Sequence, residues 1–228
     1  MSSAKPAARF ITKCDMQENF DHTDIKIQHT ETVFSGFFRV LRYRLTHSLF
    51  NGGCSAPITR ELFARGDSVG VLLYDAQRDC VTLAQQFRIG CLDNEHGAWV
   101  WEVVAGMVKP DETAEDVAVR EVAEETGLHI TADCLQPIAR YYSSPGGTDE
   151  RLQLFCALCE LPEDLDGIHG LPEEGEDIRV RRFAAPQVFD AMLAGTINNA
   201  ASIIALQWLQ INRDALRQRA TLNDLPVR

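Results

Sequence analysis

The residues best suited to chemistry are three closely spaced glutamates, Glu121, Glu124 and Glu125. In a helix, which advances about 100° per residue, their side chains share one sector with Val117 and Ala118. Carboxylates at spacings of three and four residues repel one another, and the C-terminal end of a helix adds its own partial negative charge. The sequence therefore places three mutually repelling acids on the face that also packs inward.

Such a cluster has three interpretations. A raised pKa neutralises one or more of the acids, a bound cation balances them, or the face is a solvated acidic surface of the kind common in acidic proteins. Arg120 and Ala123 are expected to point away from this face, so we expect no compensation from the helix itself. If a cation binds, oxygen donors alone favour Mg²⁺ or Mn²⁺ over zinc.

A helix must carry these glutamates, and the sequence supplies its start and stop signals. Thr113 and Asp116 have the spacing of a capping box, and Gly127 favours termination. We therefore predict a helix of about four turns between residues 113 and 127. Two further helices are predicted at 186–194, with a proline in the first turn, and at 198–219, with an apolar stripe.

Alternating apolar and polar residues predict a β-rich N-terminal portion. Residues 24–47 indicate a hairpin or small sheet with a turn at Ser35-Gly36, and further strands are predicted at 58–63, 68–74, 80–88, 99–104 and 152–158. Residues 1–23 are polar and patternless, so we expect a loosely held N-terminus. The mixture indicates an α+β fold or a mixed-sheet sandwich rather than a regular βαβ array.

The composition is that of a globular protein, with 228 residues of which 45% are hydrophobic and 24% charged. This length suffices for one full-sized domain, or for one domain with a smaller appendage. The net charge of −11 disfavours nucleic acid and anionic membranes as partners, and an anionic ligand would need a metal or clustered arginines. No membrane span or signal peptide is expected from the apolar runs, so we expect a cytoplasmic protein.

The seven cysteines are scattered without a zinc-ribbon spacing. Cys156 and Cys159 form a C-x-x-C in a strand-like run, where residues three apart point to opposite faces, so the pair is poorly placed to clamp a metal. We expect reduced and mostly buried thiols.

The spacing around the glutamates matches a known motif. Gly106, Glu112 and the run from Arg120 to Leu128 match the Nudix box at every position, so the sequence resembles a Nudix hydrolase. The resemblance implies an α/β/α sandwich with a mixed sheet, and hydrolysis of a nucleoside diphosphate linked to another moiety. It implies Mg²⁺, with Mn²⁺ as a substitute, and metal contacts from the carbonyl of Ala105 and the side chains of Glu121, Glu124 and Glu125.

Three further box residues have expected roles. Arg120 and Glu112 match positions that orient the helix in the family. Gly106 is expected to let the backbone approach metal and phosphate where a Cβ would collide, with an ordinary turn glycine as the alternative.

The resemblance extends over roughly residues 30–216 to the bacterial ADP-ribose pyrophosphatases. The segments that carry it are Gly36-Phe37-Phe38, Arg60-Glu61, Arg65-Gly66, 102–107, Ser144-Pro145-Gly146-Gly147-Thr148, 167–171, Glu176-Asp177-Ile178 and 199–202. By position, Phe37 resembles the aromatic on which adenine stacks. Further substrate contacts implied in the same way are Arg60, Glu61, Arg65, Arg88, Met107, Ser144, Pro145, Gly146 and Glu150, with the arginines suited to diphosphate by their fork geometry.

The segment from Gly167 to Asp177 is acidic and rich in glycine, which suits a mobile lid, although a solvated acidic loop is the default interpretation. By resemblance Glu174 matches the general base and Glu176 an additional metal contact. The chemistry of the loop alone does not choose among its acids.

The N-terminal portion, residues 1–66, is expected to precede a Nudix domain at 67–228. In the related enzymes this portion is exchanged between two subunits, which implies a homodimer in which Phe37, Arg60 and Glu61 serve the partner's site. A small sheet with few residues to cover its faces fits that expectation.

The expected function is Mg²⁺-dependent hydrolysis of ADP-ribose to AMP and ribose 5-phosphate. One alternative is a nucleotide-sugar diphosphatase of the GDP-mannose type, because the box recognises the diphosphate and not the base. Another is a Nudix-fold sensor that binds ADP-ribose without cleaving it, against which the intact box carboxylates argue.

Overall fold

The computed structural model describes residues 20–222. The chain divides into two compact units, one ending at Ala64 and the other beginning at Arg65, and each is considered by itself. Cys14 and most of the patternless segment 1–23 lie outside the described residues.

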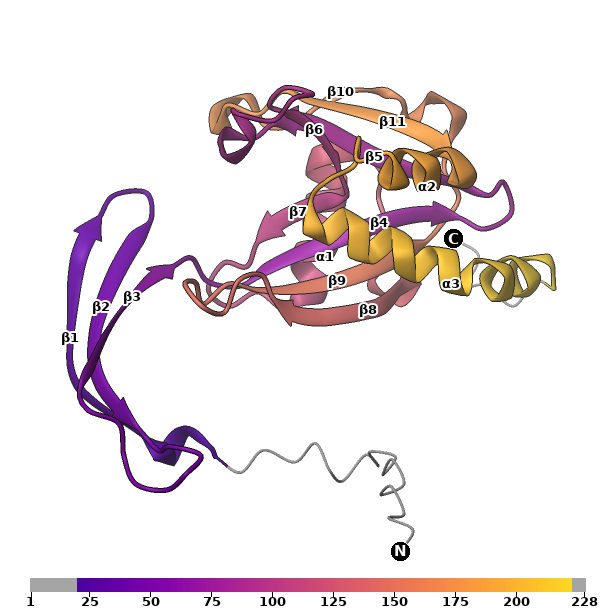
Figure 1. Ribbon diagram of the computed structural model, residues 1–228. Coiled ribbons are helices and arrows are strands. Elements are labelled where there is room, and N and C mark those ends of the chain that lie inside the picture. The colour runs from indigo at the N-terminus through magenta and orange to yellow at the C-terminus, as the bar shows by residue number, and fades with distance from the viewer. Residues whose placement is uncertain (1–19, 223–228) are drawn as a thin grey trace, which may run out of the picture. The chain divides into compact units, whose positions relative to one another are not determined.

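The first unit is a three-stranded antiparallel sheet in the order β1-β2-β3 (Figure 1). A short 3-10 turn, η2 (His22–Asp24), leads into β1 (Ile25–Ser35), β2 (Arg39–His47) and β3 (Ile58–Ala64). The register pairs Ser35 with Arg39, so the chain turns immediately after Ser35. This confirms the predicted hairpin.

The small sheet has no interior of its own. None of the described residues 20–64 is buried, and every residue of β1 is exposed. Several large apolar side chains are exposed to solvent: Ile27 is 56% exposed, Phe34 57%, and Phe37 and Phe50 each 89%. Because exposed apolar surface of this extent is uncommon on isolated domains, this sheet is a surface suited to a partner.

The second unit is built on an eight-stranded sheet with the path β10-β11-β5-β4-β9-β8, in which β6 also pairs with β5 and β7 with β4 (Figure 1). Only β4 and β9 pair in parallel among its described strands, so the sheet is mixed as predicted. The strands are β4 (Ser68–Asp75), β5 (Cys80–Phe87), β6 (Trp99–Glu102), β7 (Val104–Met107), β8 (Leu135–Tyr142), β9 (Arg151–Leu158), β10 (Gly167–His169) and β11 (Ile178–Ala184).

The strand predicted at 99–104 is two strands. Val103 separates them, because its N–H donates to the hydroxyl of Ser202 at 3.0 Å instead of to a neighbouring strand. The two pieces then pair with different strands, β6 with β5 and β7 with β4. This break directs β7 toward the helix that carries the glutamates.

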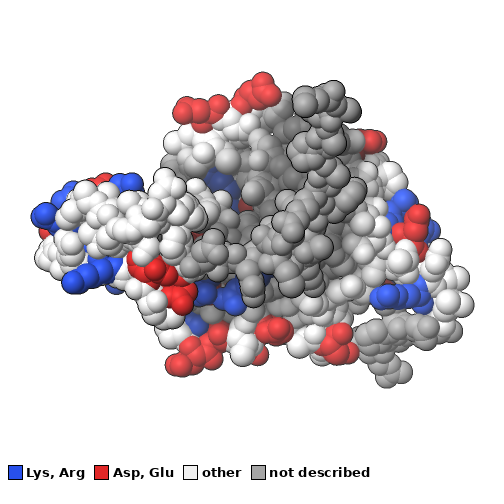
Figure 2. All heavy atoms as spheres, turned by 60° about the horizontal axis from the view of Figure 1, so that its bottom comes forward, with Lys and Arg blue, Asp and Glu red and all other residues white. Residues whose placement is uncertain are grey.

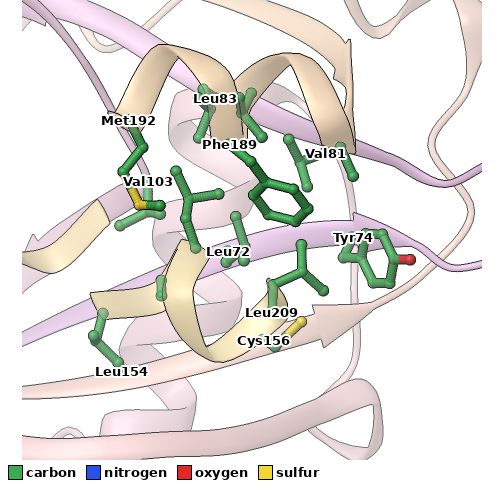
Figure 3. Packing of buried hydrophobic residues seen from close by; sticks show 14 of the residues in the cluster. Leu72, Tyr74, Val81, Leu83, Val103, Leu154, Cys156, Phe189, Met192 and Leu209 are labelled. Carbon is green, nitrogen blue, oxygen red and sulfur yellow. The ribbon is translucent and has the colours of Figure 1, made fainter. Parts of the chain in front are cut away.

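Helices cover both faces of the sheet, which confirms the sandwich. Alternate residues of β4 enter two separate cores: Leu72 and Tyr74 pack beneath α2 (Ala185–Leu193) and α3 (Ala200–Thr221), as Figure 3 shows, whereas Val71 and Leu73 pack beneath α1 (Ala114–Thr126). The remaining described helical segments are short 3-10 turns, η3 (Ile89–Cys91), η4 (Ala132–Cys134), η5 (Glu163–Leu165) and η6 (Pro172–Glu174).

Helix α1 begins and ends as its sequence signals predict. The hydroxyl of Thr113 accepts from the N–H of Asp116, and the Asp116 carboxylate accepts from the N–H of Thr113, each at 3.1 Å. Gly127 follows the helix with φ +71°, a left-handed conformation that favours glycine. The buried residues Val117, Ala118 and Val122 fix the rotation of the helix, and Glu125 is buried on the same side.

On the face shown in Figure 2, acidic and basic side chains are interspersed. No helix in the described part is long and apolar enough to cross a membrane.

The described cysteines are free, but only Cys80, Cys134 and Cys156 are buried. The expectation of mostly buried thiols therefore holds for about half of them.

Candidate active site

Arg120 lies at the centre of the acidic face, contrary to the expectation that it points away. Its Nε and Nη2 donate to both oxygens of Glu112, at 2.9 and 3.1 Å. Its Nη1 donates to Glu121 at 2.7 Å and to Glu124 at 2.9 Å. The direction of the Cα–Cβ bond does not fix where a long arginine side chain ends, so the guanidinium of Arg120 reaches these acids and compensates part of their repulsion.

Glu125 differs from the other two box glutamates. Its residue is only 2% exposed, and among the described residues its Oε2 has no hydrogen-bond partner. Burial raises the pKa of Glu125 well above its ordinary value, and the charges of Glu102 and Glu121 raise it further, whereas Arg88 opposes them. A buried carboxylate oxygen without a donor is costly, and it is suited to accept a cation.

Gly106 is required by packing against Glu121. A Cβ at position 106 would collide with the carboxyl group of Glu121 itself. Close approach of the backbone to metal and phosphate stays a prediction, whereas the contact with Glu121 is a reason for glycine that the structure shows. Burial also raises the pKa of Glu121, although Arg120 opposes the shift.

Glu102, for which no role is predicted from the sequence, lies close enough to Glu125 for its charge to act on that carboxyl group. Arg88 Nε donates to Glu102 Oε1 at 2.6 Å, and the Glu102 side chain is 12% exposed. Burial raises the pKa of Glu102 in spite of this pairing. Glu102 lies within the matched segment 102–107, and a carboxylate at the end of an otherwise apolar strand was the available signal.

Strand β7 and the loop after β10 complete the surroundings of α1. Ala105 lies on β7 opposite Gly70 and Met107 lies opposite Ser68. Glu176 accepts from the N–H of Leu171 at 3.1 Å, and its charge adds to the raised pKa of Glu121 and Glu125. Glu174 is the last residue of η6.

A second group of predicted residues gathers at the start of β4. Arg65 Nε lies 3.0 Å from Glu150, and the same carboxylate oxygen accepts from Ser68 at 3.1 Å. The neighbouring Asp149 accepts from the backbone N–H of Arg65 and of Gly66. Ser68 pairs across the sheet with Met107, so Arg65, Glu150 and Met107 are brought into one region.

The other predicted substrate residues are exposed. Ser144, Pro145 and Gly146 form a turn in which the carbonyl of Ser144 accepts from Gly147 and Thr148, both at 3.0 Å. Phe37, Arg60 and Glu61 belong to the first unit. There Phe37 stacks edge-on against Phe38, and Glu61 pairs with Arg42 at 2.8 Å.

The residues present suit a hard divalent cation by chemistry. The donors are carboxylate and carbonyl oxygens, and Glu125 carries an oxygen that no described residue hydrogen-bonds. Within residues 20–222, apart from the side chain of Glu174, no three acidic, histidine or cysteine groups stand close enough to hold one ion together as they are arranged. Arg120 bonds Glu121 and Glu124 in the arrangement observed.

The fold and this site define the class of protein. A family model described as the NUDIX domain matches residues 64–207, and the chain belongs to the Nudix hydrolase family. Enzymes of this kind generally use divalent metal ions. A solved structure titled as an ADP compounds hydrolase shares the fold, with a TM-score of 0.64 and 20% identity over 85% of this chain and 97% of that one.

Curated relatives are more similar still. The ADP-ribose pyrophosphatase of Escherichia coli K12 is 42% identical over 198 residues, which cover 87% of this chain and 93% of the relative. The ADP-ribose pyrophosphatase of Haemophilus influenzae is 39% identical over 88% of this chain and 93% of its own length. The GDP-mannose pyrophosphatase of Cronobacter sakazakii is 32% identical over 67% of this chain and 78% of its own length.

Proposed function

We propose that this protein hydrolyses ADP-ribose to AMP and ribose 5-phosphate with Mg²⁺ as the metal. The observation that supports this chemistry is the buried carboxylate of Glu125. No described residue hydrogen-bonds its Oε2, and the charges of Glu102, Glu121 and Glu176 act on it. The 42% identity to an ADP-ribose pyrophosphatase over 87% of the chain supports the substrate. The GDP-mannose pyrophosphatases are more distant and cover less of the chain.

In this proposal the metal is held by the Ala105 carbonyl and by Glu121, Glu124, Glu125 and Glu176. When bound, it would neutralise phosphoryl oxygens and lower the pKa of a coordinated water. Glu121 and Glu124 would have to release Arg120 to hold an ion. Arg120 also makes two bonds to Glu112, which would be free to tie the helix to the preceding loop when the ion is bound.

The chain's own residues supply the rest of the mechanism. Glu174 takes the proton of the attacking water as general base. Arg88 holds the diphosphate, and Arg65, Met107, Ser144, Pro145, Gly146 and Glu150 line the remainder of the substrate. Phe37 stacks on adenine, with Arg60 and Glu61 beside it.

A substrate panel tests this function. The enzyme is assayed with ADP-ribose and GDP-mannose at matched concentrations, with AMP and ribose 5-phosphate identified as products. ADP-ribose is expected to be turned over much faster, and comparable rates on GDP-mannose would replace the proposal by the broader nucleotide-sugar diphosphatase. Chelator-treated enzyme should be inactive until Mg²⁺ or Mn²⁺ is returned, and undiminished activity without metal would overturn the mechanism.

The proposed working form is a homodimer with the N-terminal portion exchanged, located in the cytoplasm. The unburied first sheet supports the dimer, and free cysteines suit a reducing compartment. Co-expression of Phe37→Ala with Glu125→Gln tests the exchange, because a mixed dimer with exchanged portions contains one intact site. Activity restored above that of either variant supports exchange, and no restoration in a proven mixed dimer contradicts it.

A further inference from the structure

Arg88 and Glu102 come from neighbouring strands that hold them in a fixed relation. Arg88 follows β5 and Glu102 ends β6, and these strands pair antiparallel with Ala84 opposite Glu102. The N–H of Arg88 donates to the carbonyl of Ala98 at 2.8 Å, so the backbone of Arg88 remains tied to the residue before β6. Ala84 packs in the core beneath α1, and the side chain opposite it, that of Glu102, faces α1 as well.

The contact uses only one edge of the guanidinium. Nε of Arg88 donates to Glu102 Oε1 at 2.6 Å. Apart from the side chain of Glu174, no residue among 20–222 forms a hydrogen bond or ion pair with either Nη group of Arg88. The Glu102 side chain is 12% exposed and that of Arg88 42% exposed, so the carboxylate is the fixed partner and the guanidinium reaches outward from it.

This ion pair adjoins the proposed metal ligands. The charges of Glu102 and Arg88 both act on Glu125, in opposite directions. A guanidinium held by Nε near Glu125 keeps two N–H donors, one on each Nη, that a diphosphate bound beside Glu125 could accept. Two such donors match two oxygens of a phosphate, a geometry that a freely rotating arginine must pay side-chain entropy to reach.

We propose that Glu102 is a positioning residue, whose carboxylate holds Nε of Arg88 so that both Nη groups face the diphosphate beside Glu125. The inference rests on the proposed function, in which Arg88 contacts the diphosphate. Glu102 itself touches neither substrate nor metal. Its effect on binding passes entirely through Arg88.

A double-mutant cycle tests this claim. The affinity of Arg88→Ala, Glu102→Ala and the double variant for a non-hydrolysable ADP-ribose analogue is measured by calorimetry at saturating Mg²⁺. Arg88→Ala should weaken binding about 10- to 100-fold, the range for charge-assisted hydrogen bonds. Glu102→Ala should weaken it less, and the double variant should lie within about twofold of Arg88→Ala, because Glu102 acts through a side chain that is already gone. Additive losses would overturn the proposal.

Two further measurements separate positioning from other roles. Mn²⁺ affinity without substrate, followed by electron paramagnetic resonance, should be unchanged in Glu102→Gln, and a marked loss would show that Glu102 is a metal ligand instead. Glu102→Gln also protects the test against misfolding, because it keeps the shape of the side chain. Its thermal stability should equal or exceed that of the wild type while analogue affinity falls, whereas a structural role predicts a loss of stability.

Arg213→Ala is the matched control. Arg213 pairs with Asp79, with Nε 2.7 Å from Oδ1, on the α3 side of the sheet. Its removal should lower stability without changing analogue affinity. One outcome is that the wild type fails to cleave ADP-ribose while the two substitutions remain non-additive for binding of the preferred nucleoside diphosphate sugar. In that case the proposed substrate is wrong and the positioning role stands. If Arg88→Ala binds normally while ADP-ribose is cleaved, the positioning role is wrong and the function stands.

Discussion

Replacing Glu125 with glutamine should stabilise the metal-free protein while it abolishes most of the activity. Glu125 is 2% exposed, has an oxygen without a partner in the described chain, and faces the negative charges of Glu102 and Glu121. Folding must therefore either bury the charge or keep the carboxyl protonated. Glutamine keeps the shape of the side chain and has no charge to bury and no proton to take up, so both of these costs disappear.

The free-energy cost of keeping Glu125 protonated in the folded state has an upper bound. About 2.5 pH units separate pH 7 from the ordinary pKa of 4.5, and each unit is worth about 1.36 kcal/mol, so protonating Glu125 costs at most about 3.4 kcal/mol at pH 7. The amide of glutamine leaves a polar group to satisfy, which costs about 1–3 kcal/mol. A net gain of about 1–2 kcal/mol in the free energy of unfolding is expected, or about 2–8 °C in Tm.

The pH dependence has a definite sign. The folded-state pKa of Glu125 is raised, so between pH 4.5 and that raised value the folded state binds more protons than the unfolded state. Wild-type stability therefore falls as pH rises through this range, and the advantage of Glu125→Gln over the wild type should disappear near pH 4.

The assay is chemical denaturation of chelator-treated protein, with turnover measured in parallel at saturating Mg²⁺. Turnover of Glu125→Gln should fall at least about 100-fold, the size of the effect of one preorganised electrostatic contact. Glu115→Gln on the exposed side of the same helix is the control, and should change neither quantity much. A variant that is less stable than the wild type, or one that retains its rate, would refute this account of Glu125.

Three further outcomes are expected. Gly106→Ala should lower turnover by about tenfold or more and cost about 1–3 kcal/mol of stability, because the new methyl group displaces the Glu121 carboxyl; an unchanged rate contradicts the packing. Glu174→Gln should lower kcat while leaving analogue binding nearly intact. If another acid of the loop shows this effect instead, that acid is the general base and Glu174 is not. Arg213→Ala should destabilise the protein at pH 7, and by less as the pH falls below the ordinary aspartate pKa of 3.8. Hydrogen bonding to Arg213 lowers the pKa of Asp79, and the stability from that pairing is lost as Asp79 becomes protonated. A destabilisation that does not change with pH argues against this pairing.

The sequence predicted most of the fold because the signals were local. The capping box and terminal glycine of α1, the apolar runs of β4 and β5, and the hairpin turn after Ser35 each act within a few residues. Strand β8 was missed because Pro137 and a register shift beside it interrupt its alternation. Strand β11 is likewise not among the predicted strands, although its first residues alternate and Ile178 and Val180 are buried.

The site was harder to predict because its decisive contacts are tertiary or depend on side-chain flexibility. A helical wheel assigns Arg120 a direction from its Cα alone, whereas its guanidinium reaches acids on two sides. The partnership of Arg88 with Glu102 joins residues 14 positions apart. The collision that a Cβ at Gly106 would cause is with the side chain of Glu121 on α1, so it depends on the packing of β7 against that helix.

The charge balance explains why metal and substrate must act together in this site. When all are ionised, two guanidinium groups, those of Arg88 and Arg120, face six carboxylates, those of Glu102, Glu112, Glu121, Glu124, Glu125 and Glu176. The formal charge is then −4, and it would repel a diphosphate, which is itself anionic. The two arginines are already counted in this sum, so bound divalent cations would have to offset the remaining charge before an anionic diphosphate could bind. Diphosphate affinity should therefore collapse when the metal is removed, even for variants that no longer catalyse hydrolysis.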